Sequence, residues 1–174
     1  DPATRLNGSF PASAWVYDRQ ASSYFDAIFL GKSSTSWYSW SLRTDDQNRL
    51  QFAISNGGSW IGATDSIALA QNTWTLVTAT WDQATNTARL SKNATQVATF
   101  TSAITRQAHD QGTLIGYYPQ ENSFFDGKID EATLFNRALS ATEITADYNA
   151  GLSGKSAAKL PLISSWSGEG DATD

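Results

Sequence analysis

Apolar and polar residues alternate in many short segments of this 174-residue chain, and this period of two predicts β-strands. The clearest segment is 49–55, where Leu50, Phe52 and Ile54 share one face while Gln51 and Ala53 share the other. Further strands are expected over 9–17, 27–32, 37–43, 74–82, 88–91, 96–100, 113–118 and 127–136. Many short strands with turn signals between them predict an all-β fold, an antiparallel β-sandwich or jelly roll.

The pattern changes after Asn136 and predicts one short helix near the C-terminus. Ser140 is a good N-cap and Glu143 follows three residues later, which forms a capping box. Leu139 and Ile144 are spaced as a hydrophobic staple, and Gly151 suits the end of the helix.

Three local features qualify the strand pattern. Pro11 interrupts the first strand, so that strand is expected at a sheet edge or with a bulge. The segment after Ile61 is expected to be a loop as far as Ile67. Ala94 occupies a predicted hairpin turn and tolerates positive φ poorly, so this turn is expected to be longer or of another type.

Two stretches resemble the laminin-G-like domains of bacterial extracellular proteins, which are concanavalin A-like jelly rolls. The closing stretch carries Phe125, Gly127, Ile129, Asp130, Glu131, Leu134, Phe135, Asn136, Arg137, Ala138, Leu139, Ser140, Glu143, Ile144 and Tyr148. The other carries Asn72, Trp74, Val77, Ala79, Thr80, Trp81 and Asp82. The resemblance implies the jelly-roll fold and places Trp15, Trp74 and Trp81 in its core. It does not select a function, because the fold hosts lectins, adhesion modules and enzymes.

The domain organisation predicted is a sandwich over 1–152 followed by a tail over 153–174. The tail begins as a linker, and 162–174 resembles the start of a further domain of the same kind, which indicates tandem repeats. The alternative is that the strand over 160–166 folds back, or swaps to a neighbour, and completes the sandwich, because an open sheet edge is a liability.

Composition narrows the possible partners. The chain has 12 basic and 17 acidic residues and shows no basic patch, so no nucleic-acid partner is expected. It has no cysteine, and no apolar run approaches the ~18 residues of a membrane span. A weakly charged surface rich in aromatics suits glycans or protein surfaces. The resemblance implies a secreted or cell-surface location, with any export signal outside this sequence.

The acidic residues do not form the pair expected of a glycan-cleaving enzyme. Asp130 and Glu131 are adjacent and point to opposite faces of a strand, while Asp126 and Asp130 are roughly 13 Å apart along it. His109 is the only histidine, and it is expected to be a solvated loop residue. No enzyme is predicted.

A calcium site is predicted at Asp126 and Asp130. Related domains often hold one calcium ion at the rim of the sheets, and Ca²⁺ prefers carboxylate and carbonyl oxygens. The alternative is that Asp130 is structural and accepts backbone N–H groups.

Aromatic side chains outside the expected core are the candidates for sugar contact. They are Trp37, Tyr38, Trp60, Tyr117, Tyr118 and Phe124. The predicted function is a non-catalytic recognition module that binds a glycan, or a cell-surface or matrix protein in adhesion. The alternatives are a structural spacer in a tandem array and, less favoured, a glycan-cleaving enzyme.

Overall fold

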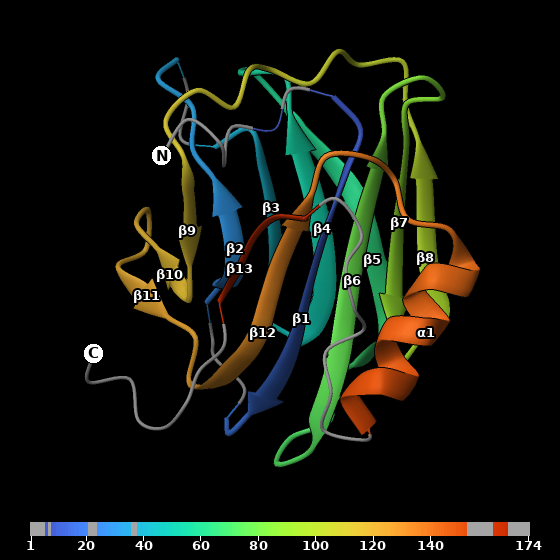
Figure 1. Cartoon of the computed structure of the whole chain (residues 1–174). Helices are drawn as coiled ribbons and strands as arrows, with labels where there is room; N and C mark the ends of the chain where they lie inside the picture. The colour runs from blue at the N-terminus through green and yellow to red at the C-terminus, as the bar shows by residue number, and fades with distance from the viewer. Residues whose placement is uncertain (1–5, 7, 21–23, 36–37, 153–161, 167–174) are drawn as a thin grey trace.

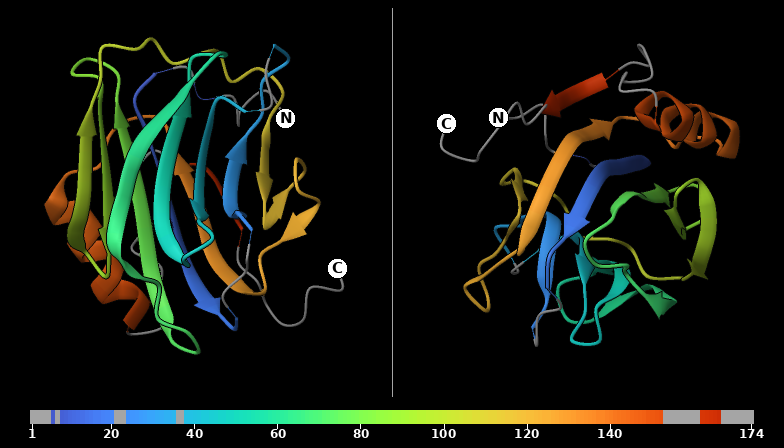
Figure 2. Two further views of the ribbon diagram at one scale, coloured as in Figure 1. Left: turned by 180° about the vertical axis from the view of Figure 1, so that it is seen from behind. Right: turned by 90° about the horizontal axis from the view of Figure 1, so that it is seen from below.

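The computed structural model describes residues 6, 8–20, 24–35, 38–152 and 162–166 (Figure 1). In this part of the chain, two large antiparallel sheets pack face to face, with a small hairpin and one helix outside them (Figures 1 and 2). The predicted all-β sandwich with a short C-terminal helix is therefore confirmed.

The first sheet has six strands in the order β13-β12-β1-β6-β7-β8. Their bounds are β1 Phe10–Asp18, β6 Trp74–Asp82, β7 Thr87–Lys92, β8 Thr95–Thr101, β12 Gly127–Phe135 and β13 Leu162–Trp166. The second sheet has five strands in the order β5-β4-β3-β2-β9. These are β2 Asp26–Gly31, β3 Trp40–Thr44, β4 Arg49–Ser55, β5 Trp60–Ala68 and β9 Thr113–Ile115. The hairpin consists of β10 Tyr117–Tyr118 and β11 Ser123–Phe124, beside β2.

The core lies between the two sheets and is built from alternate residues of their strands. Phe10, Trp40, Phe52 and Trp81 are fully buried there, and the rings of Phe10 and Trp40 lie 4.7 Å apart. Burying one large apolar side chain contributes about 1.5–3 kcal/mol, so this layer holds the sheets together. Trp81 confirms its predicted core position, whereas Trp74 is 41% exposed and lies against Tyr17 on the outside.

Strand β1 lies in the middle of its sheet, between β12 and β6, so the predicted edge position is wrong. Its pairing with β12 begins at Ala12 and shifts register between Ser13 and Trp15, which is the predicted bulge. Pro11 precedes the first residue paired with β12. Pro11 pairs with Thr80 of β6 but has no partner on β12, so a proline is tolerated in this central strand where one of the two ladders is absent.

Three expectations for the local structure are wrong. Residues 60–68 form one strand, β5, rather than a loop, because the segment pairs with β4 along its whole length. The strand expected over 113–118 is interrupted at Gly116, which has φ +72° and separates β9 from β10. The turn between β7 and β8 has only two residues, Asn93 and Ala94, and both have positive φ.

The helix α1, Ala141–Leu152, lies across the outer face of the six-stranded sheet (Figure 1). Its capping box is formed: Ser140 N donates to Glu143 Oε2 at 2.8 Å, and Glu143 N donates to Ser140 Oγ at 3.3 Å. The staple residues Leu139 and Ile144 pack together with Phe135. The predicted start and anchor of the helix are confirmed.

Two residues of the connection between β8 and β9 are buried against the core. His109 is fully buried, and its Nδ1 accepts hydrogen bonds from Leu6 N at 3.0 Å and Trp40 Nε1 at 3.2 Å. Nε2 therefore carries the proton and faces Gly112 O at 2.7 Å. The expectation of a solvated histidine is wrong, because the ring satisfies two buried donors. Nearby, burial lowers the pKa of Arg106 to about 10.

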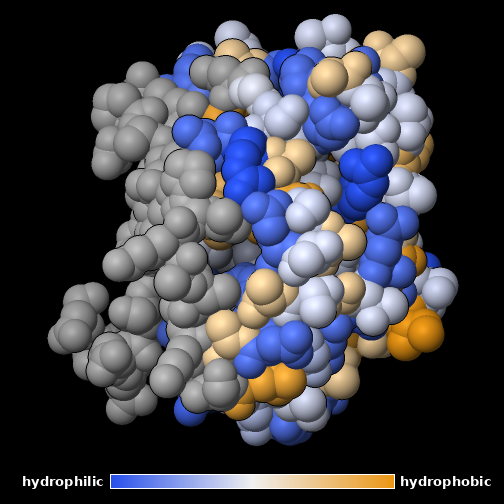
Figure 3. All heavy atoms as spheres, turned by 45° about the vertical axis from the view of Figure 1, so that its right-hand side comes forward, coloured by the Kyte–Doolittle hydropathy of each residue, from blue (hydrophilic) through white to orange (hydrophobic). Residues whose placement is uncertain are grey.

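The backbone of β13 pairs with β12 at the edge of the six-stranded sheet. The tail strand thus lies beside the sandwich of its own chain, while the assignment of 153–174 to a further repeat stays a prediction. Among the described residues no helix is long and apolar enough to cross a membrane. Figure 3 shows small hydrophobic patches scattered among polar residues on the face it presents.

Candidate functional site

The outer face of the five-stranded sheet carries the most distinctive group of side chains. In β3, Trp40 and Leu42 point into the core, so Ser41 and Arg43 point outward. The strand register aligns Arg43 with Gln51 on β4, and Gln51 with Thr64 on β5. A polar row therefore crosses three strands of this face.

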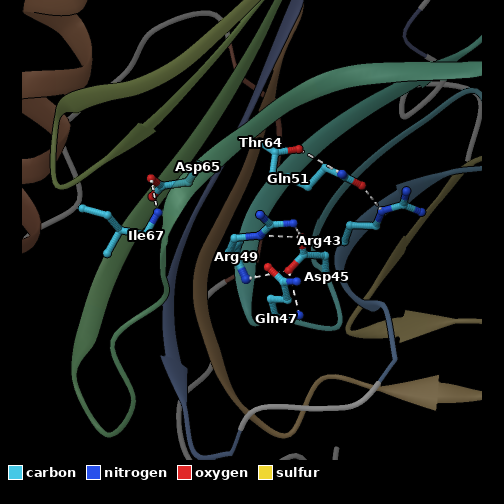
Figure 4. A network of polar contacts seen from close by, with 8 residues as sticks. All are labelled: Arg43, Asp45, Gln47, Arg49, Gln51, Thr64, Asp65 and Ile67. Carbon is cyan, nitrogen blue, oxygen red and sulfur yellow. Dashed lines mark hydrogen bonds and ion pairs between the residues drawn. The ribbon is translucent and has the colours of Figure 1, made fainter.

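Hydrogen bonds connect the side chains of this polar row (Figure 4). Arg43 Nε donates to Gln51 Oε1 at 2.9 Å, and Gln51 Nε2 donates to Thr64 Oγ1 at 3.0 Å. On its other side, Arg43 Nη1 donates to the Tyr118 hydroxyl at 2.7 Å. Burial raises the pKa of Tyr118 to about 12, so this hydroxyl is neutral at physiological pH. The guanidinium is held from two sides.

Aromatic rings surround the Arg43 guanidinium. Its Cζ lies 4.0 Å from the ring centre of Phe25, 5.3 Å from that of Trp60, and 5.5 Å from those of Tyr38 and Tyr118. Arg43 is only 1% exposed, and among the described residues no carboxylate forms an ion pair with it. The ring faces supply the compensating interaction instead. We call this group, with the polar row, the Arg43 face.

Two aromatic side chains of this region are exposed to solvent. Trp60 is 51% exposed although its ring lies near Arg43, and Phe124 of the hairpin is 65% exposed. Phe124 stacks on Tyr117 with ring centres 4.7 Å apart and an interplanar angle of 24°. A flat ring that is fixed on one side and exposed on the other can stack on the C–H face of a sugar.

The structure brings five of the six predicted aromatic residues to this side of the molecule. Tyr38, Trp60 and Tyr118 surround Arg43, while Tyr117 and Phe124 form the neighbouring hairpin stack. Trp37 lies outside the described residues. The strand predicted over 37–43 is shorter in the structure, because β3 begins only at Trp40, and Tyr38 packs on the face opposite to Trp40.

Sequence reasoning missed Arg43, Gln51, Thr64 and Phe25. The alternation in β3 contained a usable signal, because it places Arg43 opposite Trp40 and Leu42. A charged residue facing away from the core is usually solvated, however, and nothing local indicates that Phe25 and Tyr118 cover it.

The two predicted calcium ligands have protein partners. Asp126 forms an ion pair with Arg19 at 2.6 Å, and Asp130 Oδ1 accepts a hydrogen bond from Glu131 N at 2.8 Å. No cluster of three or more His, Cys, Asp or Glu side chains suited to a metal ion occurs within the described part of the chain. Calcium binding at Asp126 and Asp130 stays a prediction.

A second group of carboxyl side chains lies beside α1. Glu131 has φ +47° at an irregular position of β12, and burial, with the charges of Asp130 and Asp147, raises its pKa. Burial also raises the pKa of Asp147, whose Oδ2 lies 3.4 Å from Ser13 Oγ. Glu131 belongs to β12 and Asp147 to α1, so the two carboxyl groups lie where the helix packs on the sheet.

A family model for laminin-G-like domains of the concanavalin A-like lectin/glucanases superfamily matches residues 1–145. A search of curated proteins by sequence finds no match. The sequence family thus agrees with the observed sandwich.

Several solved structures share the fold. A Bacteroides ovatus protein described as carbohydrate-binding is 20% identical, with a TM-score of 0.71, and the match covers 94% of this chain and 46% of that one. Domain 4 of the extracellular arabinanase AbnA from Geobacillus stearothermophilus, solved with arabinotriose, is 18% identical, with a TM-score of 0.65. The match covers 82% of this chain and 68% of that one. A sialidase from Trypanosoma rangeli is 13% identical, with a TM-score of 0.67, and the match covers 86% of this chain and 24% of that one. At these identities the likeness shows the fold alone, and this chain spans less than half of the first and third proteins.

Proposed function

This chain belongs to the concanavalin A-like lectin/glucanases superfamily, and from that premise we propose that it is a non-catalytic glycan-binding module whose site is the Arg43 face. The observation that carries the proposal is Trp60, whose ring is half exposed yet lies 5.3 Å from a buried, hydrogen-bonded guanidinium. Such a ring is a pre-oriented stacking surface.

The chemistry of the face suits sugar hydroxyls as well as sugar rings. Gln51 and Thr64 lie in line beside Arg43 and belong to one hydrogen-bonded row. Arg43 acts as a positioning residue, because it fixes the Gln51 amide and lies against the Trp60 ring without being exposed itself. Two of the structural relatives support a glycan ligand, one described as carbohydrate-binding and one solved with arabinotriose.

The proposal extends to a role in adhesion for a secreted or surface-attached protein.

The calcium site at Asp126 and Asp130 is a separate proposal, because the aromatic face has no need of a metal. A thermal melt with and without calcium tests it directly: a ligand that binds only the folded state raises the midpoint.

The test of the glycan site is an array of neutral and acidic glycans, followed by titration of the best ligand. Trp60→Ala is expected to weaken binding about tenfold or more, which corresponds to about 1.4 kcal/mol. Trp74→Ala is the matched control, because Trp74 is 41% exposed but starts β6 on the other sheet.

Three outcomes contradict the proposal. Binding that is lost equally with Trp74→Ala places the site elsewhere. A protein that binds no glycan but melts cooperatively is a spacer or binds only protein. Release of shorter sugars from the bound glycan shows an enzyme.

A further inference from the structure

The edge of β12 is occupied by a strand that comes from outside the matched domain. β13 pairs antiparallel with β12, from Ala132↔Trp166 to Phe135↔Leu162. The family match ends at residue 145, whereas β13 begins at Leu162. The matched sandwich therefore does not include this strand.

Without β13, this part of β12 would be an open sheet edge beside the core. Ala132 and Leu134 belong to the main core cluster, and Thr133 and Phe135 are also buried. An edge with unpaired N–H and C=O groups is a template for a further strand. At the opposite side of the same sheet, β8 packs against β5 of the other sheet. The β12 edge is thus the side of this sheet that an added strand covers.

The connection to β13 is long enough to reach more than one acceptor. Leu162 lies beside Phe135, at the end of β12 from which the chain leads to α1. The helix has 12 residues and runs back alongside the sheet for about 18 Å (Figure 1). Residues 153–161 then join Leu152 to Leu162, and ten Cα steps at full extension span about 36 Å. That length is about twice the ~18 Å over which α1 runs back, so the connection has slack beyond what the chain's own β12 requires.

We propose that the β12 edge is a strand-docking surface whose second occupant is the β13 strand of another copy of this chain. The backbone hydrogen bonds are the same in both arrangements, and only the connection differs, so the exchange carries little energetic penalty. Reciprocal exchange gives a closed dimer, whereas one-way exchange gives an open head-to-tail chain of copies. This proposal does not rest on the glycan site.

Concentration decides which arrangement dominates. A strand tethered by a short linker has an effective concentration on the order of millimolar. Pairing of β12 with the β13 of the same chain therefore dominates over exchange between copies at micromolar protein concentration. Exchange dominates when the internal route is blocked, or when copies are held close together as in a tandem array.

The experiment blocks the internal route by deleting residues 154–160. The remaining two-residue connection spans three Cα steps, about 11 Å, which is shorter than the ~18 Å length of α1. At micromolar concentration the full chain is expected to sediment as a monomer, and the shortened chain as a dimer or larger species. Adding Ser164→Pro to the shortened chain is expected to restore the monomer, because a proline in the middle of the five-residue β13 supplies no backbone N–H and disfavours pairing with β12.

Two results overturn the proposal. A shortened chain that stays monomeric and melts at the temperature of the full chain shows that the edge needs no strand. Oligomers that survive Ser164→Pro show that the copies associate elsewhere.

A peptide measurement decides the question if the shortened chain does not fold. A fluorescent peptide of residues 160–168 is titrated into the full chain carrying Ser164→Pro. Saturable binding to this variant, with none to the unmodified chain, is the expected result. No binding to the variant overturns the proposal.

Discussion

The two outer faces of the sandwich use aromatic side chains for opposite purposes. On the six-stranded sheet, Trp15 is stacked on Tyr148 of α1 with ring centres 5.7 Å apart. On the five-stranded sheet, no helix among the described residues covers Trp60, and its ring remains half exposed. The difference shows that an outward-facing tryptophan is a packing residue where another element covers it and a candidate ligand platform where none does.

The largest expected contrast is in stability. Trp15→Ala should lower the free energy of unfolding by about 3 kcal/mol, because it removes the ring on which α1 rests. Gly151 shows how close this contact is: a Cβ built there would lie 2.3 Å from Trp15 Nε1. Trp60→Ala, the matched control, should cost less than about 1 kcal/mol, because half of that ring is already in water. Urea unfolding followed by circular dichroism measures both.

Equal losses in the two variants would break the comparison, because Trp60 would then be as much a packing residue as Trp15. A small loss in Trp15→Ala would show instead that the staple around Leu139 and Ile144 holds α1 without the aromatic stack.

The next contrast is between two carboxyl groups of α1 and appears as opposite responses to pH. Burial raises the pKa of Asp147, so the folded state holds its proton more tightly and this group lowers stability as pH rises through the raised pKa. Hydrogen bonds from Arg137 and Ser140 lower the pKa of Glu143 to about 2, so its contribution is present at neutral pH and is lost as pH falls toward 2.

Asp147→Asn should therefore raise stability at pH 7 by roughly 0.5 kcal/mol, within the usual range for partly exposed positions, and should have little effect near pH 4. The asparagine oxygen still accepts from Ser13 Oγ. Glu143→Gln is the control and should change stability in the opposite direction at pH 7. Urea midpoints at the two pH values test the pair. A loss of stability at pH 7 in Asp147→Asn would mean that its carboxylate is stabilised in the folded protein.

The sequence was most informative where the structure depends on neighbours in the chain. Alternation predicted β4 and β6 at their observed bounds, and the Ser140–Glu143 pair predicted the start of α1. Residues close together in sequence determine these features, because local alternation sets which side chains face the core and a nearby side chain accepts the hydrogen bond of a free backbone N–H at the helix start.

The Arg43 face could be predicted only in part, because its members meet through the sheet register. Phe25, Trp60 and Tyr118 are separated from Arg43 by 17 to 75 positions in sequence. Strand β5 was missed for a related reason: Asp65 is polar but buried, because it pairs with Lys92 at 2.5 Å on a strand of the other sheet. Such partners become visible only when the strands are placed.

The last expected effect, no larger than that of Asp147→Asn, is at the Asn93–Ala94 turn, where packing and backbone strain compete. Ala94 has φ +63°, and the left-handed conformation is unfavourable for an L-residue by roughly 1–2 kcal/mol. Its methyl group also packs against the Phe135, Leu139 and Ile144 cluster that anchors α1. Ala94→Gly removes both the strain and this contact and adds freedom to the unfolded chain, so the expected net gain is only about 0.5 kcal/mol. Ala94→Val keeps apolar contact with the cluster but worsens the strain, so it should be the least stable of the three.

Urea midpoints in the order glycine, alanine, valine support strain as the deciding term. The reverse order would mean that contact with the α1 anchor outweighs the backbone, and that this face is held together more by its packed side chains than by the geometry of its turns.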